Sequence, residues 1–322
     1  MVGTDGAMRF ASMCIASPGL GAKEREALAR RCALMVCSLL LTTAPAAKPL
    51  VMVSGLDAAQ LGLLARAGAE TVPSPGIGPW NSSGLVWRRR PAALAAAAEP
   101  ARLYTYHKLR MWDPAFVGAR RVAFVDSDAV FVRNGSGLLE TVAPPAALYL
   151  RDDCKPPNVP WETWDPGIII DGAAVPKAAA YWNTGVVVYE PDAGVYGDLV
   201  AAYRSGDFAA LDMGAYVCEG DVLQTYYWRK FRGDLPRPLD AKFNFRGYKC
   251  SYAEISSKAD VRVVHKEDRR AQRLILDVCE GVDLRARTDR VPALLAELRA
   301  ALDAGTCGDD RARARVRDAC PG

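Results

Sequence analysis

Short apolar runs alternate with longer stretches of helical composition along the first part of the chain. Apolar runs of this length, bounded by polar residues, suit strands that are buried on both faces. Strands are predicted at residues 8–16, 50–53, 70–72 and 121–125, and helices at residues 23–41, 58–67 and 102–112. Because strands and helices alternate, the pattern predicts an α/β fold with a mostly parallel central sheet flanked by helices.

The second half of the chain continues the alternation after a break. Strands are predicted at residues 147–150, 186–189 and 261–264, and helices at residues 138–142, 192–205 and 219–231. Residues 73–98 read as an irregular insertion, and residues 151–175 as a long, proline-rich loop of the kind that often carries function. Residues 273–322 are rich in alanine, arginine and leucine at helical spacing. We therefore expect one α/β domain over residues 1–272 and a helical C-terminal extension over residues 273–322.

Composition and charge narrow the class of protein. The chain has 322 residues, of which 50% are hydrophobic and 24% charged, as in ordinary globular proteins. Its 41 basic and 37 acidic residues are too balanced to favour a nucleic-acid partner. The N-terminus lacks a basic segment followed by an apolar core, and the apolar run at residues 32–41 is too short to span a bilayer. We expect a soluble cytoplasmic protein without a membrane segment, and its oligomeric state stays open.

Nine cysteines are present, and none form a Cys-x-x-Cys pair. The odd count and the spacing indicate neither a zinc site nor a disulfide framework, so a reducing compartment is favoured. Cys307 and Cys320, which flank a charged segment, could pair if the protein is secreted.

The strongest candidate for chemistry is Asp126-Ser127-Asp128, which follows the apolar run at residues 121–125 directly. Ligands of open α/β sheets bind outside the carboxyl ends of the strands, where these two carboxylates are expected to lie. Hard oxygen ligands there suit Mg²⁺ or Mn²⁺, which would also bind a diphosphate. The other interpretation is a turn that ends the strand, because Asp and Ser favour turns.

Five segments, in this order, resemble motifs of the glycogenin-like glycosyltransferases of family 8, which have the GT-A fold. The segments are Tyr104-Thr105-Tyr106-His107-Lys108-Leu109, Asp126-Ser127-Asp128, Trp182-Asn183-Thr184-Gly185-Val186, Glu219-Gly220-Asp221-Val222-Leu223-Gln224 and Val263-Val264-His265. Their order and spacing agree from about residue 8 to residue 270. The resemblance implies a Rossmann-like α/β sandwich and the metal-dependent, retaining transfer of a hexose from a nucleotide sugar.

The resemblance also implies roles for particular residues. Asp126, Asp128 and His265 would ligate Mn²⁺ or Mg²⁺. The donor, for which a UDP-sugar such as UDP-glucose is favoured, would be bound by the metal site together with a set of nearby residues; the acceptor, whether glycan, protein or small molecule, stays open. The candidate donor-binding residues are Lys108, Asp126, Ser127, Asp128, Asn183, Thr184, Gly185 and Lys266. His107, the other histidine of the chain, has no such context and reads as structural.

The candidate catalytic carboxylates are Asp221 and Glu219. Retention of configuration requires either a nucleophile opposite the leaving diphosphate or a front-face route assisted by the diphosphate. The family's glutamine near the anomeric carbon is Gly220 here, so these two residues are the only carboxylates of the segment. In the first turn of a helix the dipole favours their ionised forms. The alternative is that they only cap this helix.

Three departures from the family pattern keep other functions open. No aromatic residue follows the first strand, Gly220 replaces the glutamine, and the segment after His265 lacks the usual glycine and lysine. One alternative is a haloacid-dehalogenase-like phosphatase with Asp126 as nucleophile and Asp128 as acid, although Thr225 stands where its second metal-binding aspartate is expected. The other is a catalytically weak binding protein of the family-8 type. Assays of donor hydrolysis and transfer would separate the three.

Overall fold

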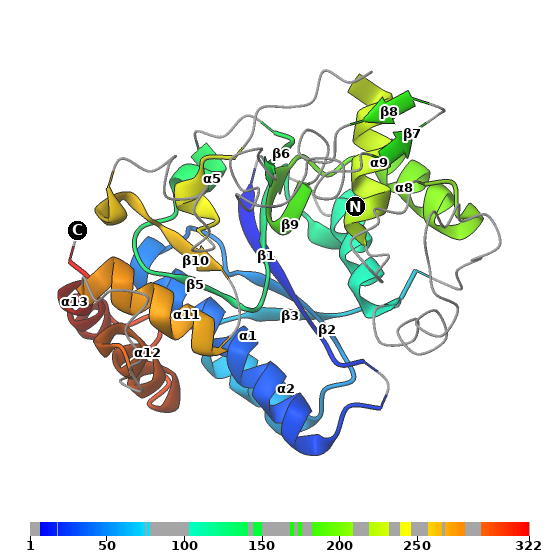
Figure 1. The fold of residues 1–322 in the computed structure, drawn as a ribbon. Coiled ribbons are helices and arrows are strands. Elements are labelled where there is room, and N and C mark those ends of the chain that lie inside the picture. Colours follow the sequence, from blue (N-terminus) through cyan, green and yellow to red (C-terminus); the bar gives the residue numbers. More distant parts are fainter. Residues whose placement is uncertain are drawn as a thin grey trace.

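The computed structural model describes residues 7–17, 19–74, 76–77, 103–140, 144–149, 168–170, 173–175, 182–208, 219–231, 239–245, 257–265, 268–280 and 291–321. The predicted α/β architecture is confirmed, with a mostly parallel central sheet between two layers of helices (Figure 1). The strand order is β3-β2-β1-β4-β9-β6. The strands are β1 (Met8–Ile15), β2 (Leu50–Ser54), β3 (Glu70–Pro73), β4 (Arg121–Val125), β6 (Ala146–Tyr149) and β9 (Trp182–Tyr189).

Strands β3, β2, β1 and β4 run parallel, while β9 is antiparallel to both of its neighbours, β4 and β6. Successive residues of a strand face opposite sides of the sheet. In β4, Ala123 and Val125 enter one buried cluster, and Val122 and Phe124 enter the other. This burial on both faces explains why the central strands are continuous apolar runs rather than alternating ones.

Different helices cover the two faces of the sheet. On one face lie α1 (Ala22–Thr43) and α2 (Ala58–Arg66), and on the other lie the 3₁₀ helix η2 (Leu103–Trp112), α4 (Pro114–Val117), α8 (Ala193–Ser205) and α9 (Glu219–Phe231). Side-chain caps begin several of these helices. Asp57 and Gln60 form a capping box at α2, and Asp192 accepts a hydrogen bond from the backbone of Val195 at α8.

Two small antiparallel sheets accompany the central one. Strand β5 (Ala129–Phe131), which follows β4, pairs with β10 (Val263–His265), and β7 (Ile168–Ile170) pairs with β8 (Ala173–Val175). Short helical turns are α5 (Gly137–Glu140), η4 (Ala241–Phe243) and η5 (Lys258–Asp260). The pairing of β5 with β10 brings the C-terminal third of the chain to the end of β4.

The C-terminal segment is helical, as predicted. It contains α11 (Asp268–Ile275), a π-helical turn (Leu276–Glu280), α12 (Ala293–Asp303) and α13 (Asp310–Ala319). Helices α12 and α13 pack against α1, and their apolar side chains belong to the same buried cluster as those of α1 (Figure 1). The division after residue 272 falls within α11 and stays a prediction.

Disulfides are a point on which the sequence interpretation was wrong. Cys14 pairs with Cys32, Cys37 with Cys307, and Cys279 with Cys320. Cys307 and Cys320 therefore have separate partners, one of them 270 residues away in the sequence. Spacing could not reveal these pairs, because each depends on packing: α1 lies against β1 at Cys14–Cys32, and the segment of α12 and α13 supplies Cys307 and Cys320. Disulfides form and persist in oxidising compartments, so the cysteines no longer favour a reducing one.

The described helices include none with the length and apolar character that a bilayer crossing requires.

Candidate metal and donor site

Two carboxylates lie just beyond the carboxyl end of β4, as predicted. The backbone N–H of Asp126 donates to the carbonyl of Gly185 on β9, at 2.7 Å, which continues the β4–β9 pairing by one residue. The backbone N–H of Ala129 then donates to the carbonyl of Asp126, at 3.1 Å, and closes a turn that contains Ser127 and Asp128. The turn interpretation and the ligand interpretation are thus compatible, because the turn itself presents the two carboxylates.

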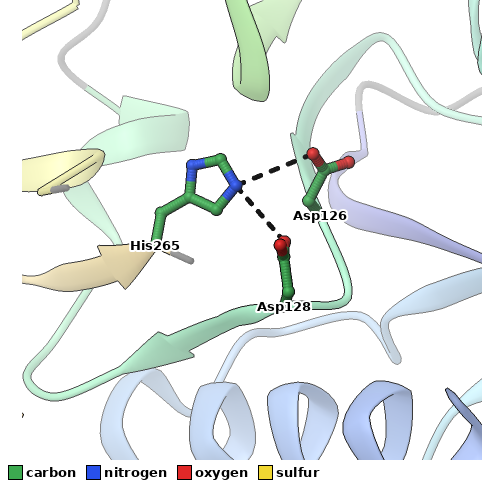
Figure 2. Close-up of side chains that lie close together, drawn as sticks. All are labelled: Asp126, Asp128 and His265. Carbon is green, nitrogen blue, oxygen red and sulfur yellow. Dashed lines mark ion pairs between the residues drawn. The ribbon is translucent and has the colours of Figure 1, made fainter. Parts of the chain in front are cut away.

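His265 reaches the same place through β10. In the antiparallel pairing of β10 with β5, His265 lies opposite Ala129, the residue after Asp128. Its Nε2 atom is 3.2 Å from Oδ1 of Asp128 and 3.7 Å from Oδ2 of Asp126 (Figure 2). The predicted convergence of the three side chains is confirmed.

The donor set suits a divalent cation. One ligand atom from each of the three residues lies within 4.8 Å of the other two. Two carboxylates and one imidazole are the ligands that Mn²⁺ accepts readily, and Mg²⁺ shares the preference for the oxygens. The Asp126 and Asp128 side chains are 26% and 24% exposed, whereas His265 is buried. A cation held here would therefore have one side open to phosphate oxygens.

Lys108 forms ion pairs with one carboxylate of this site and with Glu219. Its side chain, which is 3% exposed, extends from η2 and places Nζ 2.9 Å from Oδ1 of Asp126 and 2.8 Å from Oε1 of Glu219. Nζ also donates to the carbonyl of Thr184, at 3.1 Å. A buried ammonium needs such partners, since an unpaired buried charge is costly. Lys108 thus links the candidate metal carboxylate to α9.

These contacts set the ionisation of the buried groups. Burial alone would lower the pKa of Lys108, but the Asp126 and Glu219 carboxylates raise it above its ordinary value. Burial alone would raise the pKa of Glu219, but Lys108 and the hydroxyl of Thr184, whose Oγ1 donates at 2.7 Å, lower it. The net result is a buried ion pair. Burial raises the pKa of Asp126; Lys108 opposes this rise and the Asp128 carboxylate adds to it.

Gly185 allows His265 to lie directly against β9. A Cβ atom at this position would be 2.6 Å from both ring nitrogens of His265 and closer still to Cε1. The sequence interpretation placed this glycine among the donor-binding residues, and in the structure it makes room for the imidazole of His265. The neighbouring Asn183 is also turned inward, because its Oδ1 accepts hydrogen bonds from the backbone of Gly185, at 3.2 Å, and from Nδ2 of Asn244, at 2.9 Å.

The other residues singled out in the sequence differ in burial, and one of them lies outside the described residues. Asp221 lies in the first turn of α9, as predicted, but is only 1% exposed. Ser127 is half-buried within the Asp126–Asp128 turn, and Lys266 lies outside the described residues. His107, expected to be structural, has Nδ1 2.6 Å from Oγ of Ser74, and burial lowers its pKa.

Asn244 is a residue of the site that the sequence interpretation missed. It is fully buried, and its Oδ1 is 2.7 Å from Nδ1 of His265. The one signal in the sequence is an amide between two aromatic residues, Phe243 and Phe245, both of which are buried. A polar side chain in so apolar a setting needs a hydrogen-bond partner.

Solved structures similar to this chain are glycosyltransferases. The bifunctional glycosyltransferase WbbM has 12% identity and a TM-score of 0.51, with 92% of this chain and 52% of that chain covered. The galactosyltransferase LgtC, in complex with donor and acceptor sugar analogs, has 13% identity and a TM-score of 0.48, with 81% and 87% covered. Mouse xyloside xylosyltransferase 1 has 12% identity and a TM-score of 0.47, with 82% and 98% covered.

No protein-family model matches the chain, and no curated protein matches it. At these identities the likeness to solved structures shows a shared fold alone. The predicted GT-A fold is therefore confirmed, and the chain spans about half the length of WbbM.

Proposed function

We propose that the protein is a metal-dependent glycosyltransferase that transfers a hexose from a nucleotide sugar with retention of configuration. The convergence of Asp126, Asp128 and His265 at the carboxyl end of β4, in a GT-A fold, carries this proposal. Membership of the glycogenin-like family 8 is part of the proposal, supported by the five motifs in order. The phosphatase alternative is less well supported, because Thr225 replaces the carboxylate that it needs.

The proposed ligands are the carboxylates of Asp126 and Asp128 and Nε2 of His265. A bound Mn²⁺ or Mg²⁺ would neutralise the negative charge that develops on a diphosphate leaving group. Lys108 would contribute to donor binding indirectly, because its ammonium already holds the Asp126 carboxylate at 2.9 Å. Ser127 and Lys266, together with the segment of Asn183, Thr184 and Gly185, remain proposed donor-binding residues.

Asp221 and Glu219 stay the two proposed catalytic carboxylates. Glu219 forms an ion pair with Lys108 and accepts a hydrogen bond from Thr184, so its negative charge is already compensated. Compensation of this kind lowers the nucleophilicity of a carboxylate and suits a supporting role. Asp221 is 1% exposed, so donor binding would have to uncover it before it could approach an anomeric carbon.

The donor is proposed to be UDP-glucose or UDP-galactose, and the acceptor a glycan, a protein or a small molecule. We also propose that the protein acts in an oxidising compartment rather than in the cytoplasm, because three disulfides join its described residues. A count of free thiols in the denatured, unreduced protein tests this second point. Accessible thiols at all nine cysteines would contradict it.

The proposed activity is tested by incubating the protein with UDP-glucose or UDP-galactose and Mn²⁺ and measuring the release of UDP and free sugar. We expect hydrolysis that Asp128→Asn and EDTA both abolish. Calorimetric titrations with UDP, GDP and ADP would identify the base. Cleavage of p-nitrophenyl phosphate without release of UDP would favour the phosphatase, and donor binding without turnover would favour a binding protein.

A further inference from the structure

We propose that Asn244 is a positioning residue that fixes the imidazole of His265 with its proton on Nδ1 and with Nε2 unprotonated toward Asp126 and Asp128. The inference rests on the proposed metal site, since a histidine can ligate a cation only through an unprotonated nitrogen. It is carried by three successive hydrogen bonds, called the relay below, which link the backbone N–H of Gly185 through Asn183 and Asn244 to the imidazole of His265.

The direction of each hydrogen bond follows from the first. The backbone N–H of Gly185 can only donate, so the Asn183 atom that it meets, at 3.2 Å, must be the amide oxygen. That oxygen also faces the Asn244 amide at 2.9 Å, so the Asn244 atom there must be the donor, Nδ2. The other end of the Asn244 amide is therefore its oxygen, and it lies 2.7 Å from Nδ1 of His265. Nδ1 must then carry the proton, which leaves Nε2 as the ligand atom.

Without this relay the neighbouring carboxylates would favour the opposite tautomer. Nε2 lies 3.2 Å from Oδ1 of Asp128 and 3.7 Å from Oδ2 of Asp126. In the absence of a cation, both oxygens attract a proton on Nε2. A ring with its proton on Nε2 cannot ligate a metal through that atom. The Asn244 oxygen at Nδ1 therefore counteracts the preference for a protonated Nε2 that the two carboxylates create.

The relay is rigid because its members are buried and its backbone is paired. Asn244 is 0% exposed and His265 3%, so no water competes strongly for their polar atoms. The backbone N–H of Phe245 donates to Val263, and that of His265 donates to Phe245, at 2.9 and 2.8 Å. These bonds hold Asn244 beside β10. Outer-shell partners of this kind orient a metal-binding histidine and raise its basicity.

The first test is a long-range ¹H–¹⁵N correlation spectrum of the metal-free protein. The chain has 2 histidines, and the spectrum of His107→Gln assigns the His265 ring unambiguously. We expect Nδ1 of His265 to resonate as a protonated nitrogen, because the Asn244 amide oxygen accepts its hydrogen bond. An unprotonated Nδ1 in the wild-type protein would overturn the proposal.

The second test compares Asn244→Ala with Asn244→Asp. The alanine variant removes the acceptor, so the neutral ring should carry its proton on Nε2 and show an unprotonated Nδ1, and Mn²⁺ affinity should fall about 10- to 100-fold. The aspartate variant keeps an oxygen against Nδ1 but loses the Nδ2 donor to Asn183, so it should retain a protonated Nδ1. Circular dichroism controls for folding; if the alanine variant does not fold, the wild-type and aspartate spectra decide the question.

An unchanged Nδ1 signal and unchanged Mn²⁺ affinity in folded Asn244→Ala would contradict the positioning role. Failure of the metal-site proposal has a different signature. In that case Nδ1 is protonated in the wild-type protein, as the relay requires, but calorimetry detects no binding of Mn²⁺ by any of the three proteins.

Discussion

Replacing Gly185 with alanine should remove His265 from the candidate metal site while leaving the fold in place. Gly185 lies on β9, where its carbonyl accepts the backbone N–H of Asp126 and its Cα faces the imidazole. Alanine preserves the backbone hydrogen bond, and the position has no positive φ that would disfavour a side chain. The perturbation is therefore a single methyl group directed at one ring.

The size of the effect follows from the distances. An added Cβ would lie 2.6 Å from Nδ1 and from Nε2 of His265, whereas unstrained contacts between heavy atoms are about 3.5 Å or more. Because Cε1 of the ring would be closer still, the ring would have to move by more than about 0.9 Å, whereas ligand distances in metal sites hold to about ±0.2 Å. We therefore expect Mn²⁺ affinity to fall at least about 10-fold, which is roughly 1.4 kcal/mol of binding free energy.

The assay is a calorimetric titration with Mn²⁺, combined with circular dichroism and thermal unfolding. Gly197→Ala is the matched control, because Gly197 is an exposed residue of α8 with no atom within 4 Å of an added Cβ. Alanine within a helix should leave metal affinity unchanged and stabilise the fold by about 0.5 to 1 kcal/mol. Wild-type Mn²⁺ affinity in folded Gly185→Ala would refute the argument that this glycine seats the histidine.

Other substitutions test the remaining parts of the account. Lys108→Met should lower the free energy of unfolding by about 3 to 5 kcal/mol in denaturant titrations, because it leaves the buried Glu219 carboxylate unpaired; a loss near zero would show that the ion pair is not stabilising. Asp221→Asn should lower turnover at least about 100-fold, roughly 2.7 kcal/mol of barrier, with donor affinity nearly kept; near-wild-type turnover would leave helix capping as its role. Replacing Cys37 and Cys307 by serine should cost about 2 to 4 kcal/mol of stability by thermal unfolding, and an unchanged unfolding temperature would contradict the disulfide.

The sequence predicted most of the elements because each central strand is buried on both faces. Helix α9 was predicted over residues 219–231 and has these bounds, since its acidic first turn and apolar positions are local signals. The direction of β9 was not predicted. An apolar run looks the same whichever way the strand runs, and the antiparallel pairing with β4 depends on the path of the chain between them.

Within the candidate site, residues with a local sequence signal were predicted, whereas those that depend on non-local pairing were not predicted from the residues alone. Asp126 and Asp128 follow their strand directly and could be found locally. His265 was selected only through the resemblance to a family, because the β5–β10 pairing that brings it to Asp128 is non-local. Asn244 was missed altogether, since a single buried amide has no periodicity and no motif. The disulfide of Cys37 and Cys307 was missed because the two cysteines are 270 residues apart in the sequence and meet only where α12 and α13 pack against α1.

The central claim is that a divalent cation at Asp126, Asp128 and His265 binds the diphosphate of a nucleotide sugar. The most direct measurement is a calorimetric titration of the protein with UDP, with Mn²⁺ and again with EDTA. Asp128→Ala is titrated beside Asp310→Ala, a control at an exposed aspartate of α13. We predict that UDP binds the wild-type protein and the control when Mn²⁺ is present, and that EDTA or Asp128→Ala abolishes binding. An affinity for UDP that survives EDTA unchanged would contradict the claim.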